Sequence, residues 1–124
     1  MVRAIEWVSQ GTESHIRLLD QTLLPSEETY LEVDSSDVLI DAINRLAVRG
    51  APALGAAGGY GVALALLEGS RKGWSEAETT AAINAIALAR PTAVNLAWGA
   101  RRVESVAGGD FDRALAEAHA IAVE

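Results

Sequence analysis

Hydrophobic and polar positions follow two different periods along this chain, and the change from one to the other divides it. Three short runs of apolar or β-branched residues, separated by turn signals, have the character of strands: residues 3–8, 15–20 and 29–33. From Val38 onward, apolar residues recur every three or four positions, as on the buried face of a helix. The pattern therefore predicts an α+β fold, with a small antiparallel sheet of two or three strands in residues 1–34 and a bundle of about five helices in residues 35–124.

The first two predicted helices meet at an Arg-Gly-Ala-Pro corner. The first begins after candidate caps at residues 35–37 and ends at Arg49-Gly50, where glycine can adopt a left-handed conformation. The second covers about residues 52–67 and is apolar on almost every side, so we expect it to be the central, most buried helix. Its glycines fit a helix that another backbone or a ligand approaches closely, and close approach of a backbone is the commoner reason. A loop is expected at residues 69–73.

Three further helices are predicted from capping signals. Ser75-Glu76-Ala77-Glu78 is a capping box that opens the third helix, which must stop or bend at Arg90-Pro91 because proline disfavours helical geometry in the residue before it. Thr92 is placed to cap the fourth helix, which Gly108-Gly109 ends. Asp110 is placed to cap the fifth.

Charge and composition exclude several classes of function. The net charge is −7, which argues against a nucleic-acid-binding face, and no cysteine is available for a disulfide, a thiolate zinc site or a nucleophile. Residues 50–67 are eighteen uncharged positions, but their many glycines and alanines favour a helix buried in a soluble protein over a membrane span. No apolar signal region is visible at the start. We expect a cytoplasmic protein.

Two arginines at helix junctions form the candidate site. Arg49 precedes Gly50 and Ala51 at one predicted helix start, and Arg90 lies close before another. Free backbone N–H groups at a helix start, together with a guanidinium, are a common way to hold phosphate or carboxylate. The two junctions could therefore clamp one anion from two sides. The alternative is that each arginine only caps the carbonyls of the helix that it ends.

The sequence gives weaker evidence of a functional role for the other candidate residues. His15 and His119 lack a second histidine at metal-ligand spacing, so both are predicted to be structural or exposed. A turn is favoured for Asp20-Gln21-Thr22, and Asn95 could reach a ligand or the third helix. The tryptophans are predicted to fill the core or an interface. No acid, base or nucleophile set, no metal site and no cofactor motif is evident.

Three segments of the chain resemble a known enzyme family. They are Arg17-Leu18-Leu19-Asp20-Gln21-Thr22-Leu23-Leu24-Pro25, Val48-Arg49-Gly50-Ala51-Pro52-Ala53-Leu54-Gly55 and Ala89-Arg90-Pro91-Thr92-Ala93-Val94-Asn95-Leu96. Together they are similar to methylthioribose-1-phosphate isomerase, a family in the superfamily of the α, β and δ subunits of translation initiation factor 2B. The Arg-Gly-Ala-Pro corner is shared with ribose-1,5-bisphosphate isomerase, whereas the other two segments point more narrowly to the methylthioribose enzyme.

The resemblance implies an aldose–ketose isomerisation in methionine salvage, from 5-methylthioribose 1-phosphate to 5-methylthioribulose 1-phosphate. In that family the Arg-Gly-Ala segment and the later Arg-Pro arginine bind the substrate. The resemblance therefore assigns substrate binding to Arg49, Gly50, Ala51 and Arg90, with no cofactor. It also implies a homodimer for the full-length protein.

This chain departs from the family in one large respect. The family's catalytic cysteine and aspartate lie in a Rossmann-like C-terminal domain, and this sequence has neither that domain nor a cysteine. The apolar pattern of the last helix also still runs at Glu124, so the chain is predicted to be an N-terminal domain that is inactive alone. Two other interpretations stay open. One is a regulatory relative that binds a phosphorylated sugar or nucleotide, and the other is a helical interaction domain.

Overall fold

A three-stranded antiparallel sheet forms the N-terminal part of the molecule. The computed structural model describes residues 4–23, 26–45, 48 and 50–124. The strands β1 (Ile5–Val8), β2 (His15–Leu19) and β3 (Tyr30–Val33) lie in the order β1-β2-β3. Ile16 of β2 lies opposite both Trp7 and Val33. The expected sheet is confirmed, with three strands.

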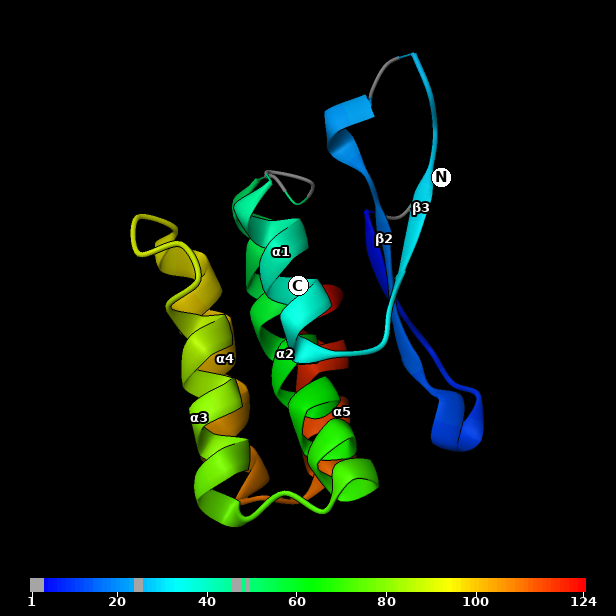
Figure 1. The fold of residues 1–124 in the computed structure, drawn as a ribbon. Helices are drawn as coiled ribbons and strands as arrows, with labels where there is room; N and C mark the ends of the chain where they lie inside the picture. The colour runs from blue at the N-terminus through cyan, green and yellow to red at the C-terminus, as the bar shows by residue number, and fades with distance from the viewer. Residues whose placement is uncertain (1–3, 24–25, 46–47, 49) are drawn as a thin grey trace.

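Five helices follow the sheet, so the predicted α+β arrangement is confirmed. They are α1 (Ser36–Asn44), α2 (Ala51–Lys72), α3 (Glu76–Ala87), α4 (Val94–Ala107) and α5 (Phe111–Ala122). Figure 1 shows the sheet on one side of α2 and the α3–α4 pair on the other. The structure thus places α2 between a β layer and a helical layer, as its all-round apolar sequence predicts.

Two of the predicted helix boundaries are wrong. The first helix ends at Asn44 with Arg45 as its C-cap, before the Arg49-Gly50 corner. The second continues through the expected loop to Lys72, and Gly73 ends it in the left-handed conformation (φ 70°). Gly69 is buried within this helix, and a methyl group there would lie 2.7 Å from the Thr79 hydroxyl oxygen, so the close packing favours glycine. Basic side chains in the last turn also suit the negative end of the helix dipole.

The capping predictions are confirmed for three helices. Ser35 accepts a hydrogen bond from Val38 N at the start of α1, and Asp110 accepts one from Asp112 N at the start of α5. The capping box of α3 is complete, with Ser75 as its N-cap. Thr92, by contrast, does not cap the fourth helix, because the N-cap of α4 is Ala93. The start of α4 therefore has no side-chain cap.

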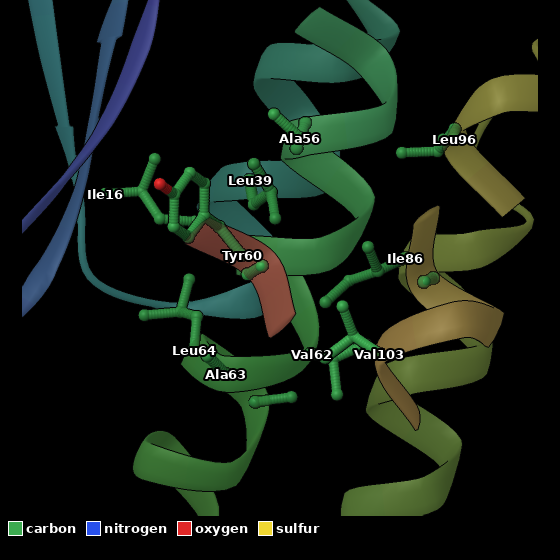
Figure 2. Packing of buried hydrophobic residues seen from close by; sticks show 14 of the residues in the cluster. Ile16, Leu39, Ala56, Tyr60, Val62, Ala63, Leu64, Ile86, Leu96 and Val103 are labelled. Atoms are coloured by element: carbon green, nitrogen blue, oxygen red, sulfur yellow. The ribbon is translucent and has the colours of Figure 1, made fainter. Parts of the chain in front are cut away.

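The core is built around α2 from small and branched side chains. Tyr60, Val62, Ala63, Leu64 and Ala65 are almost completely buried. Figure 2 shows Tyr60 and Leu64 on the side of the sheet, while Val62 faces helical neighbours. An 18-residue window of α2 is long and apolar enough to cross a membrane, but 72% of that window is buried inside the fold. This burial is what a central core helix requires.

A buried carboxylate joins α1 to α2. Glu68 is buried, and its Oε1 accepts a hydrogen bond of 2.9 Å from the backbone N–H of Ser36. Its Oε2 accepts a bond of 2.7 Å from the Lys72 ammonium group. Burial alone would raise the pKa of Glu68, but the hydrogen bonds from Lys72 and Ser36 outweigh it and lower that pKa. Glu68 is therefore ionised at neutral pH and caps the first turn of α1.

An imidazole joins β2 to its neighbours on the outer face of the sheet. His15 Nδ1 lies 2.8 Å from the carbonyl oxygen of Glu13, and Nε2 lies 2.7 Å from a carboxylate oxygen of Glu32. Both partners only accept hydrogen bonds, so the protonated ring, in which both nitrogens donate, satisfies this arrangement fully. The Glu13 carbonyl and then the Glu32 carboxylate raise the pKa of His15 above its ordinary value, against the effect of burial and the smaller effect of the Arg17 charge.

The pH dependence of this contact has a definite sign. Because the pKa of His15 is higher in the folded chain than its ordinary value near 6.5, its protonation stabilises the fold fully below that value. This contribution is lost as the pH rises through the raised pKa. We expect the urea midpoint of the protein to fall between about pH 6 and about pH 9 by more than that of His15→Gln. Parallel curves for the two proteins would show that His15 contributes nothing to this dependence.

Candidate functional site

The starts of α2 and α4 lie side by side at one end of the bundle. The amide nitrogen Nδ2 of Asn95 lies 3.4 Å from the carbonyl oxygen of Ala51 and donates a hydrogen bond to it. One turn further on, Gly55 of α2 touches Gly99 of α4, and after another turn Gly59 faces Val103. Each step advances both helices by four residues in the same direction. The helices are therefore parallel, and their N-termini point the same way (Figure 1).

Glycines allow the backbones of these two helices to touch. A methyl group on Gly58 would meet the backbone of Leu96 and would lie 2.9 Å from the backbone nitrogen of Ala100. One on Gly99 would meet the backbone of Gly55. Neither position has room for a side chain, because backbone atoms cannot rotate away as a flexible side chain can. The glycines of α2 thus hold the two helix starts close together, as the sequence predicted for a helix that another backbone approaches.

These two helix starts differ from the other three in their capping. Neither α2 nor α4 has a side-chain cap, and neither has an acidic residue in its first turn. In contrast, α1, α3 and α5 each have a capping side chain and at least one acidic residue in the first turn. The first N–H groups of a helix have no partner within the helix and carry a partial positive charge. At α2 and α4, no side chain of the described residues neutralises that charge.

The residues predicted for the site divide into those that the structure describes and one that it does not. Gly50 is the N-cap of α2 with φ 89°, a conformation that favours glycine, and Ala51 is the first residue of the helix. Arg90 lies in the connection from α3 to α4, where its carbonyl oxygen accepts a 2.8 Å hydrogen bond from Ala93 N. Arg49 lies outside the described residues. Its assignment, and the two-arginine clamp, therefore stay predictions.

Arg90 is also distinct among the described arginines. Its side chain makes no hydrogen bond or ion pair with any described residue, whereas the other described arginines each have an acceptor or a carboxylate nearby: Arg17, Arg45, Arg71, Arg101, Arg102 and Arg113. The sequence around the two helix starts is also free of acidic residues. Residues 42–67 and 79–103 contain no aspartate or glutamate. Among the residues that the structure describes, the guanidinium of Arg90 therefore has no partner that would compete with an external anion.

Asp20, which belongs to the first family-like segment, has a structural role. Its Oδ1 accepts hydrogen bonds from Thr22 N at 3.0 Å and from Thr22 Oγ1 at 2.6 Å. These bonds lower the pKa of Asp20, with a further contribution from Arg45, whose Nη1 lies 3.9 Å from Oδ2. The turn favoured from the sequence is therefore confirmed. Arg45 also pairs with Asp41, so Asp20 and Arg45 fix the end of β2 to the end of α1.

Two residues beside the helix starts make contacts that differ from the sequence predictions, in which Asn95 reaches a ligand or the third helix and Trp98 fills the core or an interface. Asn95 contacts α2, through Ala51, and this contact joins the two starts directly. Trp98 lies one turn further along α4, and its side chain packs beside Gly55 although the residue is 48% exposed. Trp7, by comparison, stacks against Tyr60 in the interior. Helical spacing of three from Asn95 to Trp98 could have indicated a shared face, but only the parallel packing shows which helix that face meets.

The described residues also contain a cavity and lack a metal cluster. A cavity of about 580 Å³ lies between the C-terminal half of α2, the start of α3 and the end of α4, with Trp74, Thr79 and Glu104 in its lining. It is at the opposite end of the bundle from the uncapped starts and contains none of the predicted site residues. Within the ranges that the structure describes, no group of three histidine or acidic residues is arranged to hold a metal ion.

Three proteins of known name that are similar to this chain in sequence share one name. No protein-family model matches the chain. Proteins named methylthioribose-1-phosphate isomerase are 47% identical in Anaeromyxobacter sp. (strain K) over 86% of this chain, and 50% identical in Heliobacterium modesticaldum over 76% of it. The protein of that name from Xanthomonas campestris pv. campestris is 46% identical over 99% of the chain. This chain spans only 28% to 35% of the length of these relatives.

Two solved structures share the fold. The delta subunit of translation initiation factor eIF-2B from A. fulgidus superposes with a TM-score of 0.81 at 35% identity, covering 98% of this chain and 36% of that one. The 5-methylthioribose 1-phosphate isomerase from Pyrococcus horikoshii OT3 superposes with a TM-score of 0.74 at 27% identity, covering 99% of this chain and 36% of that one. The resemblance predicted from the sequence is confirmed, and this chain is a relative of the methylthioribose-1-phosphate isomerases that corresponds to about a third of their length.

Proposed function

We propose that this chain provides the phosphate-binding part of an isomerase that converts 5-methylthioribose 1-phosphate to 5-methylthioribulose 1-phosphate. One observation carries the proposal. The two helix starts that lie side by side are the two without a side-chain cap or an acidic first turn, and Arg90, next to one of them, is unpaired among the described residues. The similarity to proteins named for this reaction supports a sugar phosphate as the anion.

The proposed site suits the phosphate of this substrate. The unpaired N–H groups of both helix starts point the same way as the positive ends of the two helix dipoles. A phosphate placed there accepts hydrogen bonds from these groups and from the Arg90 guanidinium, which binds two phosphate oxygens at once in the geometry that arginine favours. Arg49, Gly50 and Ala51 complete the site in this proposal.

The chemical steps need groups that this site does not supply. Phosphate on the anomeric oxygen blocks simple ring opening, so the ring must be opened by an acid before hydrogen moves between C1 and C2. The helix starts offer hydrogen-bond donors and a guanidinium, which hold the substrate but do not exchange protons at neutral pH. We therefore assign binding to this chain and the proton transfers to groups elsewhere in the full-length enzyme. A homodimeric, cytoplasmic enzyme is part of the same proposal.

Removal of the Arg90 side chain tests the site. We expect Arg90→Ala to weaken binding of 5-methylthioribose 1-phosphate to this chain by at least about 1.5 kcal/mol, roughly tenfold in Kd, because a charge-assisted hydrogen bond is lost. Isothermal titration calorimetry measures the Kd. Arg101→Ala is the matched control, because Arg101 lies on α4 but pairs with Asn84 and Glu104 instead of facing the helix starts.

The possible outcomes separate the proposal from a purely structural role. Equal Kd values for the parent and Arg90→Ala would remove Arg90 from the site. Equal weakening by Arg90→Ala and Arg101→Ala would show a general effect of net charge. A parent chain that binds no sugar phosphate at all would contradict the proposed function of the chain as a binding part.

The fold supports one other candidate function. The TM-score and identity with the delta subunit of eIF-2B exceed those with the Pyrococcus horikoshii isomerase. A regulatory protein that senses a phosphorylated sugar or nucleotide could use the same uncapped helix starts. Competition binding discriminates between the two, because a nucleotide sensor binds AMP or GDP more tightly than 5-methylthioribose 1-phosphate.

A further inference from the structure

Trp98 is an exposed, well-positioned aromatic side chain beside the uncapped helix starts. It is 48% exposed, and its ring atom Cζ3 would lie 3.6 Å from a methyl group on Gly55. The guanidinium carbon of Arg102 lies 5.4 Å from the ring centroid. Arg102 in turn donates hydrogen bonds of 2.6 Å to both Glu117 and Glu124 of the C-terminal segment. The indole is therefore held against α2 on one side and by a fixed cation on another.

The position of Trp98 relative to the proposed phosphate site follows from helix geometry. It is the fifth residue of α4, so its backbone lies about 6 Å along the helix axis from that of Val94. Long side chains in a helix lean toward its N-terminus, which brings the indole back toward the helix start. Val94 lies on the same face one turn earlier and is 73% exposed. An apolar surface thus adjoins the anion-binding end.

The proposed substrate also combines a charged end with an apolar end, as the surface around the helix starts does. Its phosphate is on C1, and its methylthio group is on C5, at the other end of the ribose. Sulfur of a thioether packs favourably against an aromatic ring. When the phosphate of this substrate lies on the helix starts, its methylthio end can reach the apolar surface of Trp98 and Val94. A sugar phosphate with a charged or hydroxyl group at C5 would gain less from that surface.

On the basis of the proposed function, we propose that Trp98 recognises the methylthio group and so determines specificity for 5-methylthioribose 1-phosphate over a sugar phosphate that lacks it. The ring provides a preformed contact surface that needs little ordering on binding, because Gly55 and Arg102 already hold it. A ligand with a hydroxyl group in place of the thioether gains nothing from this surface. Its affinity then depends on the phosphate contacts alone.

Two ligands that differ at C5 test this inference. Calorimetry is used to measure the Kd of the chain for 5-methylthioribose 1-phosphate and for ribose 1-phosphate. We expect the parent to prefer the thioether ligand by about 2- to 10-fold, the range of sulfur–aromatic contacts. Trp98→Ala is expected to abolish the preference while leaving the Kd for ribose 1-phosphate unchanged, and Trp98→Phe is expected to keep most of it.

A matched control and three outcomes make the test decisive. Trp74→Ala removes a tryptophan that also lies near a cation, Lys72 at 5.5 Å, but at the other end of the bundle, and it should leave the preference intact. A preference that survives in Trp98→Ala would overturn the inference, and so would a parent that binds both ligands equally. Both results leave the phosphate site in place. Failure of the parent to bind either ligand would refute the proposed function itself.

Discussion

Replacement of Gly99 by alanine is expected to lower the free energy of unfolding by about 3 kcal/mol, at the upper end of what overpacking usually costs. The added methyl group would meet the backbone carbonyl of Gly55 and would lie 2.9 Å from its carbon atom. Because the obstacle is backbone, the two helices must separate, and they lose close contact along their length. Urea denaturation followed by circular dichroism measures the change.

Gly55→Ala is the matched control on the facing helix. A methyl group on Gly55 would have no atom nearer than Trp98 Cζ3 at 3.6 Å, which is an ordinary van der Waals contact. Alanine also favours a helix over glycine by about 1 kcal/mol. We therefore expect Gly55→Ala to be as stable as the parent or more stable. Equal destabilisation by the two substitutions would show that the helices are not packed through Gly99.

Replacement of Glu68 by leucine is expected to lower the free energy of unfolding by about 2 kcal/mol, within the range for leaving a buried polar group unsatisfied. Leucine keeps most of the buried volume but cannot accept the hydrogen bond from Ser36 N. The amide at the start of α1 then loses its acceptor inside the protein. Differential scanning calorimetry or urea denaturation gives the change.

Glu68→Gln isolates the role of the charge in this contact. Glutamine keeps an acceptor for Ser36 N but no longer pairs with Lys72, whose side chain is 55% exposed. A pair with one exposed partner contributes little, so we expect a loss well under half of that in Glu68→Leu. If the two variants unfold at the same urea concentration, the hydrogen bond to α1 is not what Glu68 contributes.

Local signals predicted most of the fold. Three strands, the capping box at Ser75, the Asp110 cap and the burial of α2 all follow from the period of apolar residues and from side chains that bond nearby backbone. The errors arose where a tertiary contact decides the boundary. Gly69 lies inside α2 and packs near Thr79 and Trp74, a tertiary contact that no local pattern reveals.

The candidate site was predicted only in part, because its geometry also depends on tertiary contacts. The sequence identifies Gly50, Ala51 and Arg90 as residues at helix junctions, but their proximity depends on α2 and α4 packing in parallel. That packing depends on which faces of Gly55, Gly58 and Gly99 meet, which the sequence spacing alone leaves open. Trp98 could not be placed beside Gly55 for that reason, and the capping predicted for Thr92 depended on a helix start one residue earlier than the observed one.

Because α2 and α4 lack side-chain caps, binding of an anion at their starts is coupled to the folding equilibrium of the chain. Donors left without an internal acceptor stabilise the native state less than capped ones would, by about 1 kcal/mol for each cap. An anion that binds the native chain alone supplies the acceptors and raises stability by mass action, by about 2.7 kcal/mol at a hundred times its Kd. Thermal melting in the presence of increasing phosphate therefore reports on the same backbone groups that we propose to bind the substrate phosphate.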